Sequence, residues 1–437
     1  MKKTKLRKLI VAAAVVSVLS ASTLAACESG SDTAQEDGDG SVTWSTWGTP
    51  DELKIFEQFN KKFGEEHPDL KVNFQPVASY TDYHSKLNTQ LTSNTAPDVF
   101  YVGDDQIANL VSNNVLEPLD SHLNAQDSPI SLEDFSESIY QVAQLDGKTY
   151  ALPNDVNPDA FWYDKEALQA AGITEDPATL AEQDKWNTDA FFEMTDKLKS
   201  AGMTGAAFWN YWSTTDSIIT SQGGVVYDDN GEYQANKNKA SVDAIATWSE
   251  RFKNGQFVVA DILPSGQDAD TLFVQHKLGF LVQGRYTVST IEGAGNSVDQ
   301  YDVVRWPTPD GKPASSGVAA SFLAINKNAK DKDAAAKFLA EFLSKDGQKL
   351  RLSQSGNALP SIHGIDDIVS GSQKPAHVDA LLEMRDNGYS NYRPEAVVPG
   401  LSDSIANEYM LPLYQGKKAA QKTLDEVAKL ISEKTKK

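Results

Sequence analysis

The chain of 437 residues contains a single cysteine, Cys27, whose thiol could carry a covalent group but has no partner for a disulfide within the chain. It follows five basic residues between Lys2 and Lys8, an apolar segment at 9–19 and the sequence Leu24-Ala25-Ala26. That order is typical of a secretory signal peptide, and the apolar segment is too short for a stable membrane span. The placement of Cys27 therefore predicts an attachment point and not a redox group.

A second group of candidate functional residues is the aromatic run Phe208-Trp209-Asn210-Tyr211-Trp212, whose rings could bind a ligand. It follows a short apolar strand, at the carboxyl edge where ligands bind in open α/β sheets. Because three rings within four positions cannot all point into a core, we expect Trp209, Tyr211 or Trp212 to line a binding site. Core packing is the alternative for each ring, and Phe208 is assigned to the core.

Two further pairs of residues stand at strand ends. Trp47 and Gly48 end the first predicted strand, where a glycine lets the backbone approach a ligand closely. Asp104 and Asp105 follow a strand that ends at Val102, so one of them could accept hydrogen bonds from ligand hydroxyls. The alternatives are a hydrophobic staple for Trp47 and helix N-capping for the aspartates.

The elements that position these residues alternate between strand and helix periodicity. Strands are predicted from Ser41 to Trp47-Gly48 and at 70–74, 98–102, 160–163, 206–208 and 278–282. Four helices are predicted from apolar stripes: Leu53/Phe56/Phe59/Phe63, Tyr83/Leu87/Leu91, Val242/Ile245/Trp248/Phe252 and Leu424/Val427/Leu430/Ile431. A further helix is predicted at 187–201, and Gly202 after it is a predicted left-handed cap. Asp146-Gly147, Asn230-Gly231 and Asp310-Gly311 indicate tight turns. This alternation predicts parallel α/β sheets.

Length and charge limit the function further. Removal of residues 1–26 would leave 35 basic and 61 acidic residues, a formal charge of −26. Nucleic acid is therefore an unsuitable partner, and an anionic lipid surface would be repelled. The segment 28–40 is rich in Gly, Ser, Asp and Glu and is predicted to be a disordered tether. The remaining chain is long enough to predict two lobes.

Several motifs occur in an order that resembles the family 1 extracellular solute-binding proteins, the substrate receptors of carbohydrate ABC importers and relatives of maltose-binding protein. These motifs are Trp47-Gly48, Ala96-Pro97-Asp98-Val99-Phe100, Gly147-Lys148-Thr149-Tyr150-Ala151-Leu152-Pro153, Tyr163-Asp164-Lys165, Gly223-Gly224, Phe273 with Leu278-Gly279-Phe280, Gly284-Arg285-Tyr286, and the helix 334–343 with Ser344, Asp346 and Gly347 behind it. The residues Leu24-Ala25-Ala26-Cys27 resemble a bacterial lipobox. The resemblance spans nearly the whole mature chain.

The resemblance implies an α/β fold of two periplasmic-binding-protein lobes of type II, each a mostly parallel sheet flanked by helices. Three hinge strands would join the lobes around a ligand cleft. The expected division is a signal peptide at 1–26, acylated Cys27 and tether at 27–40, lobe 1 at 41–154 plus about 318–360, and lobe 2 at about 155–317 plus 361–437. A lipid-anchored monomer on the outer face of the cytoplasmic membrane would bind sugar, close, and dock on the permease subunits of an ABC importer.

The expected ligand explains which further residues are candidates, since sugars offer apolar faces to aromatic rings and hydroxyls to carboxylates and amides. Tyr286 stands where similar receptors place a stacking ring, and packing on its own helix is the alternative. Arg285 beside it could bind hydroxyls or face solvent. Further candidates surround the expected hinges and lobe walls: Asn154, Asp155, Asn157, Ser316, Gly317, Tyr80, Tyr83, His84, Asn391 and Arg393.

Enzyme signatures are weak in this sequence. Gly-x-Ser-x-Gly, Gly-x-x-x-x-Gly-Lys and Gly-x-Gly-x-x-Gly motifs do not occur, and the six histidines never show i, i+3 or i+4 spacing. No enzyme activity, cofactor or metal is therefore predicted. A surface glycoside hydrolase remains an alternative because acidic residues are abundant, and so does a receptor of the same fold for a polyamine, iron or a peptide.

Overall fold

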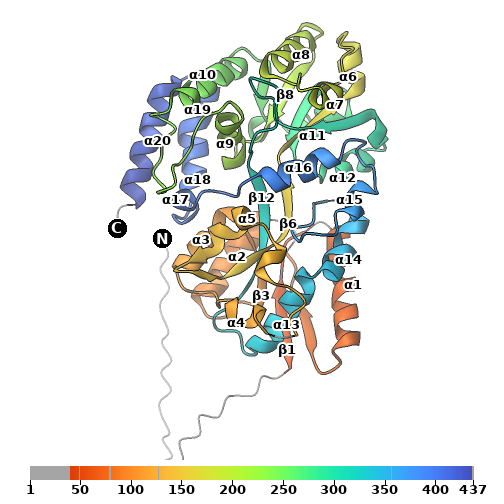
Figure 1. Cartoon of the computed structure of the whole chain (residues 1–437), viewed down its shortest axis with the longest axis vertical. Helices are drawn as coiled ribbons and strands as arrows, with labels where there is room; N and C mark the ends of the chain where they lie inside the picture. The colour runs from red at the N-terminus through yellow and green to blue at the C-terminus, as the bar shows by residue number, and fades with distance from the viewer. Residues whose placement is uncertain (1–39, 49, 78–79, 126, 356, 436–437) are drawn as a thin grey trace, which may run out of the picture. The chain divides into compact units, whose positions relative to one another are not determined.

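The computed structural model describes residues 40–48, 50–77, 80–125, 127–355 and 357–435 (Figure 1). The predicted signal peptide, Cys27 and nearly all of the predicted tether lie outside the described residues. Among the described helices, none combines the length and the apolar composition needed to cross a bilayer.

Lobe 1 is built on a five-stranded sheet of order β2-β1-β3-β12-β6. Its strands are β1 (Ser41–Ser45), β2 (Lys71–Phe74), β3 (Val99–Gly103), β6 (Ala151–Pro158) and β12 (Val318–Ile325). The helical segments of the chain around this sheet are α1 (Pro50–Glu66), α2 (Tyr80–Thr92), α3 (Asp104–Ser112), α4 (Asp120–Leu123), η1 (Leu132–Asp134), α5 (Glu137–Tyr140), η2 (Gln141–Ala143), α13 (Lys332–Leu343) and α14 (Lys345–Ser355). A short hairpin joins β4 (Gln144–Leu145) to β5 (Lys148–Thr149).

Lobe 2 is built on a second five-stranded sheet, of order β11-β7-β10-β8-β9. Its strands are β7 (Ala160–Asp164), β8 (Thr204–Phe208), β9 (Phe257–Val259), β10 (Leu278–Gln283) and β11 (Tyr301–Val304). The helical segments between and after them are α6 (Lys165–Ala170), α7 (Pro177–Glu182), α8 (Thr188–Ser200), α9 (Trp212–Ser221), α10 (Lys239–Lys253), η3 (Ala260–Ile262), α11 (Ala269–Val274), α12 (Thr287–Gly293) and η4 (Val298–Gln300).

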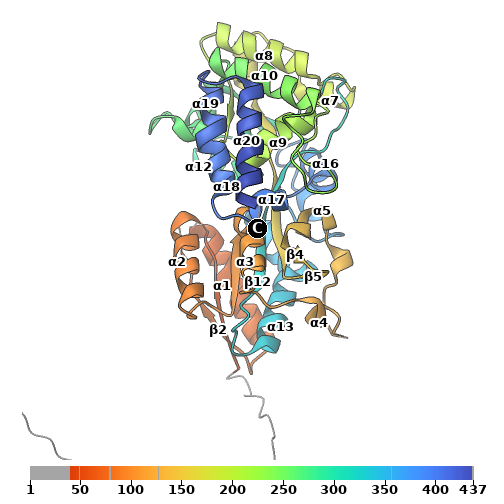
Figure 2. The ribbon, with the colours of Figure 1, turned by 90° about the vertical axis from the view of Figure 1, so that its left-hand side faces the viewer.

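The C-terminal part of the chain is helical: α15 (Asp367–Ser370), α16 (Asp379–Asn387), α17 (Arg393–Ala396), α18 (Leu401–Ser404), the π-helix η5 (Ile405–Met410), α19 (Leu411–Tyr414) and α20 (Ala420–Thr435). Helices α19 and α20 pack against α10 of lobe 2, as Figure 2 shows. The residue limits predicted for the two lobes remain predictions.

The expectation of mostly parallel sheets was wrong in detail, because each sheet is half antiparallel. In lobe 1, β1 pairs in parallel with β2 and β3, whereas β12 runs antiparallel to β3 and β6. In lobe 2, β7 runs antiparallel to β10 and β11, and β8 pairs in parallel with β9 and β10. Parallel neighbours need a crossover within their own sheet. Strands β6, β7 and β12 lie where the chain passes from one sheet to the other. They therefore need no crossover connection within one sheet and can pair antiparallel.

Local sequence explains where the helices begin and end. The Asn187 side chain accepts a hydrogen bond from the Ala190 amide at 2.9 Å and so caps α8. Gly202 follows that helix at φ +82°, which confirms the predicted left-handed cap. The hairpin turn Asp146-Gly147 has φ of +51° and +73°, as an Asp-Gly hairpin turn requires.

The core of lobe 1 forms around Trp44, whose ring is fully buried. It stacks on Phe74 at 4.5 Å and meets the edge of Phe342 from α13 at 5.2 Å. Phe56 and Phe59 of the α1 stripe are buried against the same cluster. Burial of one large side chain of this kind stabilises a fold by roughly 1.5–3 kcal/mol, so the α1 stripe fixes which face of the helix meets the sheet. The polar residues at the start of α1 are thereby turned toward the cavity between the sheets.

Candidate binding site

A cavity of about 1100 Å³ lies at the strand ends of both sheets. Its lining combines aromatic rings, carboxylates and neutral polar groups. The rings belong to Trp47, Phe56, Tyr101, Tyr211 and Tyr286, the acidic groups to Glu52, Asp104, Asp155 and Glu292, and the neutral polar groups to Gln58, Asn157, Ser289, Thr290, Ser321 and Asn357. Lys54 also contributes to the wall.

Trp47 is the lobe 1 ring best placed to act as a flat platform. It follows β1, and its ring is held by Tyr83, His84 and Tyr101 at centroid distances of 5.3, 5.2 and 5.4 Å. Edge contacts of this kind fix the plane of an indole without covering both of its faces. The second platform, Tyr286, is the N-cap residue directly before α12 (Thr287–Gly293) and is 39% exposed.

Asp104 and Tyr211 connect the two lobes across the cavity. The Tyr211 hydroxyl donates a hydrogen bond to Asp104 Oδ1 at 2.7 Å, and the Ala320 amide donates to Asp104 Oδ2 at 3.1 Å. Asp104 is only 2% exposed, and this burial raises the pKa of its carboxyl to about 7, with the neighbouring charge of Asp105 adding to the rise. The N-capping alternative was wrong for Asp104, because α3 has no side-chain cap and both carboxylate oxygens bind other donors.

Asp155 is a second acidic group of the cavity and belongs to β6. Its Oδ1 accepts a hydrogen bond from Ser321 Oγ at 2.6 Å, and its Oδ2 accepts one from Asn154 Nδ2 at 2.6 Å. Burial raises the pKa of Asp155 to about 6, although the Ser321 hydrogen bond and the Arg351 guanidinium oppose the rise. The nearby Asn157 lines the cavity and accepts a hydrogen bond from the Arg285 amide at 2.9 Å.

The structure therefore brings six of the predicted residues to one cavity and places others behind its wall. Those at the cavity are Trp47, Asp104, Asp155, Asn157, Tyr211 and Tyr286, with His84 supporting the Trp47 ring. Tyr83 is 1% exposed, and its hydroxyl donates to the carbonyls of Ser45 and Tyr101. It holds the wall together from behind, as its place in the apolar stripe indicated.

Two rings of the aromatic run lie elsewhere. Trp209 packs against the apolar core, and Trp212 is buried at the start of α9, 6.4 Å from Tyr389. Only Tyr211 reaches the cavity, because α9 begins directly after it and turns its neighbours inward. Arg285, expected in the cleft or in solvent, is buried and donates to the Ala358 carbonyl and to Ser372 Oγ.

The remaining candidates that the structure describes also lie outside the cavity lining and make contacts within the fold. The Gly317 amide donates to Ser217 Oγ at 2.8 Å, and the Ser316 carbonyl accepts from the Tyr389 amide. Asn391 is 2% exposed and lies outside the cavity lining. The side chains of Tyr80 and Arg393 lie outside the described part of the chain.

Three other predicted residues flank the site without lining it. Asp105 accepts a hydrogen bond from Gln106 Nε2 at 3.0 Å and acts on the cavity through its charge on Asp104. Asn154 is buried beneath Asp155, which accepts a hydrogen bond from its amide. Gly48 is buried in the loop after β1, which ends at Ser45 and not at Gly48 as predicted, and a side-chain carbon there would touch Glu52 and Leu53 at 3.4 Å.

Sequence reasoning missed Tyr101, Glu52, Ser321 and Asn357. Tyr101 stands inside the apolar run of β3, which reads as a fully buried strand. Glu52 stands in the first turn of α1 and resembles any acidic residue at a helix start. Ser321 stands inside β12, which runs antiparallel to β3 and places Ser321 opposite Gly103 at the end of that strand, so a carboxyl-edge argument does not point to it.

A cavity that two α/β lobes line from both sides is the arrangement of a binding protein of the type II periplasmic class. The bacterial extracellular solute-binding protein family matches residues 47–349, and the chain belongs to that family.

The chain is also similar to named relatives over most of its length. It is 26% identical over 379 residues to the diacetylchitobiose binding protein DasA of Streptomyces coelicolor, with 84% of each chain covered. It is 23% identical over 425 residues to the maltodextrin-binding protein MdxE of Bacillus subtilis, with 94% of each covered. An ABC substrate-binding protein of Listeria monocytogenes, solved in complex with cycloalternan, superposes with a TM-score of 0.76 at 20% identity, covering 90% of this chain and 98% of that one. These likenesses agree with the two-lobed α/β fold.

Proposed function

We propose that this protein is an extracytoplasmic receptor that binds an oligosaccharide in the cavity between its lobes and delivers it to an ABC importer. The observation that carries the proposal is the pairing of rings from opposite lobes, Trp47 and Tyr286, with carboxylates and amides around them. Aromatic faces pack on the apolar faces of sugar rings, while Asp104, Asp155 and Asn157 bind hydroxyls. The names of the relatives DasA and MdxE support the same ligand class.

Binding would act through the equilibrium between open and closed lobes. A ligand that touches both walls adds contacts that the open form lacks, and so shifts the population toward the closed form. The hydrogen bond between Tyr211 and Asp104 already spans the same gap. In this proposal the closed form docks on the permease subunits as a monomer held to the membrane by an acylated Cys27.

The first experiment is a calorimetric screen of the protein without residues 1–40 against mono-, di- and oligosaccharides. We expect saturable binding of at least one oligosaccharide and no product after prolonged incubation. Turnover at catalytic protein concentration would favour a hydrolase and reject the receptor proposal. The anchor is tested separately, because Cys27→Ser should release the protein from cells into the medium.

A second candidate ligand is a polyamine, favoured by the acidic groups Glu52, Asp104 and Asp155 between aromatic walls. Amines bind such a site through ion pairs and cation–π contacts. Spermidine therefore belongs in the same screen. Binding of spermidine in the absence of any saccharide binding would replace the sugar proposal, and the reverse result would reject the polyamine.

A further inference from the structure

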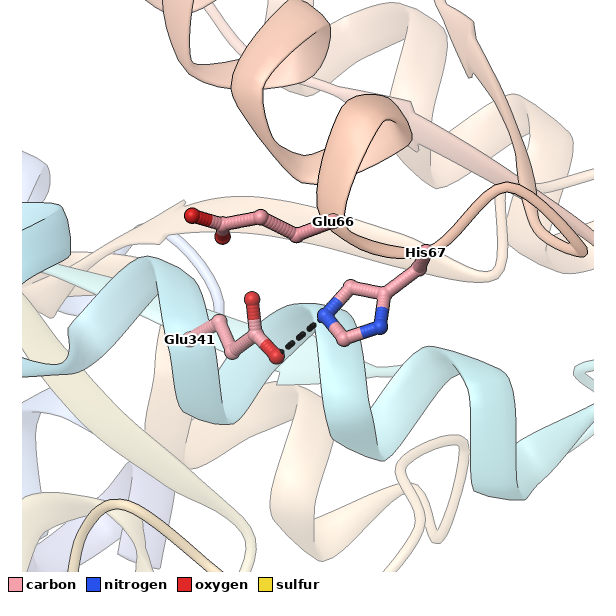
Figure 3. A group of neighbouring side chains, drawn as sticks. All are labelled: Glu66, His67 and Glu341. Carbon is pink, nitrogen blue, oxygen red and sulfur yellow. Dashed lines mark hydrogen bonds and ion pairs between the residues drawn. The ribbon is translucent and has the colours of Figure 1, made fainter.

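Two segments of lobe 1 that are far apart in the sequence place metal-binding side chains together, outside the cavity between the lobes. Glu66 ends α1 and His67 follows it, while Glu341 belongs to α13, 274 residues beyond His67. One ligand atom from each of the three residues lies within 4.8 Å of the other two (Figure 3). Within the described residues, this is the one group of three or more His, Cys, Asp or Glu side chains with that spacing.

Two of the three groups are already oriented toward each other. His67 Nε2 and Glu341 Oε1 are 2.5 Å apart, and their side chains are 18% and 25% exposed. The imidazole packs against the Phe63 ring at 4.7 Å, which fixes its plane. Figure 3 shows the imidazole nitrogen facing the Glu341 carboxylate across the space between α1 and α13. A metal ion entering here would find two ligands with little rotamer freedom left to lose.

The surroundings favour a cation. The three residues border a groove of about 390 Å³ that Asp127 and Asp346 also line. The groove holds one ammonium group, that of Lys62, which pairs with Glu66 at 3.7 Å. The Glu66 side chain is 50% exposed, so it can exchange this weak surface pair for a metal ion at little cost.

We propose that Glu66, His67 and Glu341 form a binding site for a divalent transition metal such as Zn²⁺, with water in the remaining position. One imidazole and two carboxylates suit Zn²⁺ better than Mg²⁺ or Ca²⁺, which prefer oxygen ligands alone. Ligand atoms around tetrahedral zinc lie about 3.3–3.6 Å apart, given bonds of about 2.0–2.2 Å. His67 and Glu341 would therefore separate by about 1 Å, and Glu66 would move inward. A metal ion bound to His67 Nε2 and Glu341 Oε1 would replace the hydrogen bond between the two side chains.

The site would act as a clamp between α1 and α13, not as part of the ligand cavity. The two cavities share no lining residue among the described residues. Glu52 and Glu66 are 14 residues apart on α1, or about 21 Å at 1.5 Å per residue. Metal binding should therefore raise the thermal stability of the protein without changing its affinity for the transported solute.

The test is calorimetric titration of the tag-free protein, stripped of metal with a chelator, with ZnCl₂. We expect one saturable site in the wild type and at least tenfold weaker binding in Glu341→Gln and His67→Ala. Glu341→Gln keeps an oxygen that can still accept from the imidazole, so its fold should be retained. Glu65→Gln, a neighbouring exposed glutamate paired with Lys61, is the matched control and should bind Zn²⁺ like the wild type.

Two further measurements decide the assignment. Zn²⁺ should raise the melting temperature of the wild type and of Glu65→Gln but not of Glu341→Gln, and Co²⁺ should give the visible absorption of a four-coordinate site that His67→Ala lacks. Equal Zn²⁺ affinity in wild type and both site variants, or Ca²⁺ binding as tight as Zn²⁺ binding, would overturn the proposal. A wild type that binds no Zn²⁺ would overturn it as well.

Discussion

The hydrogen bond between Tyr211 and Asp104 offers the sharpest test of how the two lobes close. Tyr211→Phe removes the hydroxyl that donates to Asp104 Oδ1 at 2.7 Å and keeps the ring at the cavity. A hydrogen bond to a charged group contributes about 1.5–3 kcal/mol, and one between neutral groups about 0.5–1.5 kcal/mol. Because burial raises the pKa of Asp104 to about 7, the loss of affinity should depend on pH.

We expect Tyr211→Phe to weaken solute binding by about 1.5–3 kcal/mol at pH 8, where the carboxylate is ionised, which is roughly ten- to a hundredfold. At pH 5.5, where Asp104 is protonated, the loss should fall to about 0.5–1.5 kcal/mol. The assay is calorimetric titration of both proteins, at both pH values, with the saccharide that the screen identifies. Tyr150→Phe, whose ring packs on the lobe 1 core outside the cavity, is the control.

Affinities within twofold of each other at pH 8 would show that the bond between Tyr211 and Asp104 does not contribute to closure. A loss of equal size at both pH values would show that the charge on Asp104 is not what strengthens the bond.

Four further outcomes follow from the structure. Trp47→Ala or Tyr286→Ala should each weaken saccharide binding by about 1–3 kcal/mol in calorimetry, the range for one buried ring, and unchanged affinity in both would reject their role as platforms. Trp209→Ala should lower the urea midpoint but leave affinity within twofold, because that ring packs on the core. Tyr83→Phe should cost about 0.5–1.5 kcal/mol of unfolding free energy, because its hydroxyl donates to two backbone carbonyls, and a tenfold loss of affinity would contradict this supporting role. Burial raises the pKa of Asp104, so its contribution to stability is present at low pH and is lost as pH rises toward about 7. The free energy of unfolding, measured with urea from pH 4 to 8, should therefore fall less steeply with pH in Asp104→Asn than in the wild type. Equal slopes in the two proteins would contradict this prediction.

Much of the fold could be predicted because it depends on local pattern. The stripe of Phe56, Phe59 and Phe63 has the period of a helix, and the helix at 50–66 follows from it. The left-handed caps and hairpin turns depend on single glycines whose conformational freedom is visible in the sequence. The antiparallel pairing of β12 with β3 and β6 was not predictable in this way, because sheet order depends on contacts between segments far apart in the chain.

Some residues of the candidate site could likewise be predicted from the sequence, and others could not. Trp47, Asp104 and Tyr286 could be proposed from sequence because each follows a strand, and strand ends of parallel pairs meet at one edge. Trp209, Trp212 and Arg285 could not be separated from true cavity residues, because the direction of a side chain depends on where the next helix begins and on what packs beside it.

By itself, the sequence indicated the strands β1, β2, β3, β7, β8 and β10, several amphipathic helices, the acidic character of the chain and the family resemblance, since each depends on residue type and spacing. Only the tertiary structure decided that Tyr211 meets Asp104 and that Ser321 meets Asp155, in pairs 107 and 166 residues apart. Contacts over such separations carry no local signature. The first contact exists because core packing in each lobe fixes which edge of its sheet faces the other, and the second because β12 pairs with β6 with Ser321 opposite Asp155.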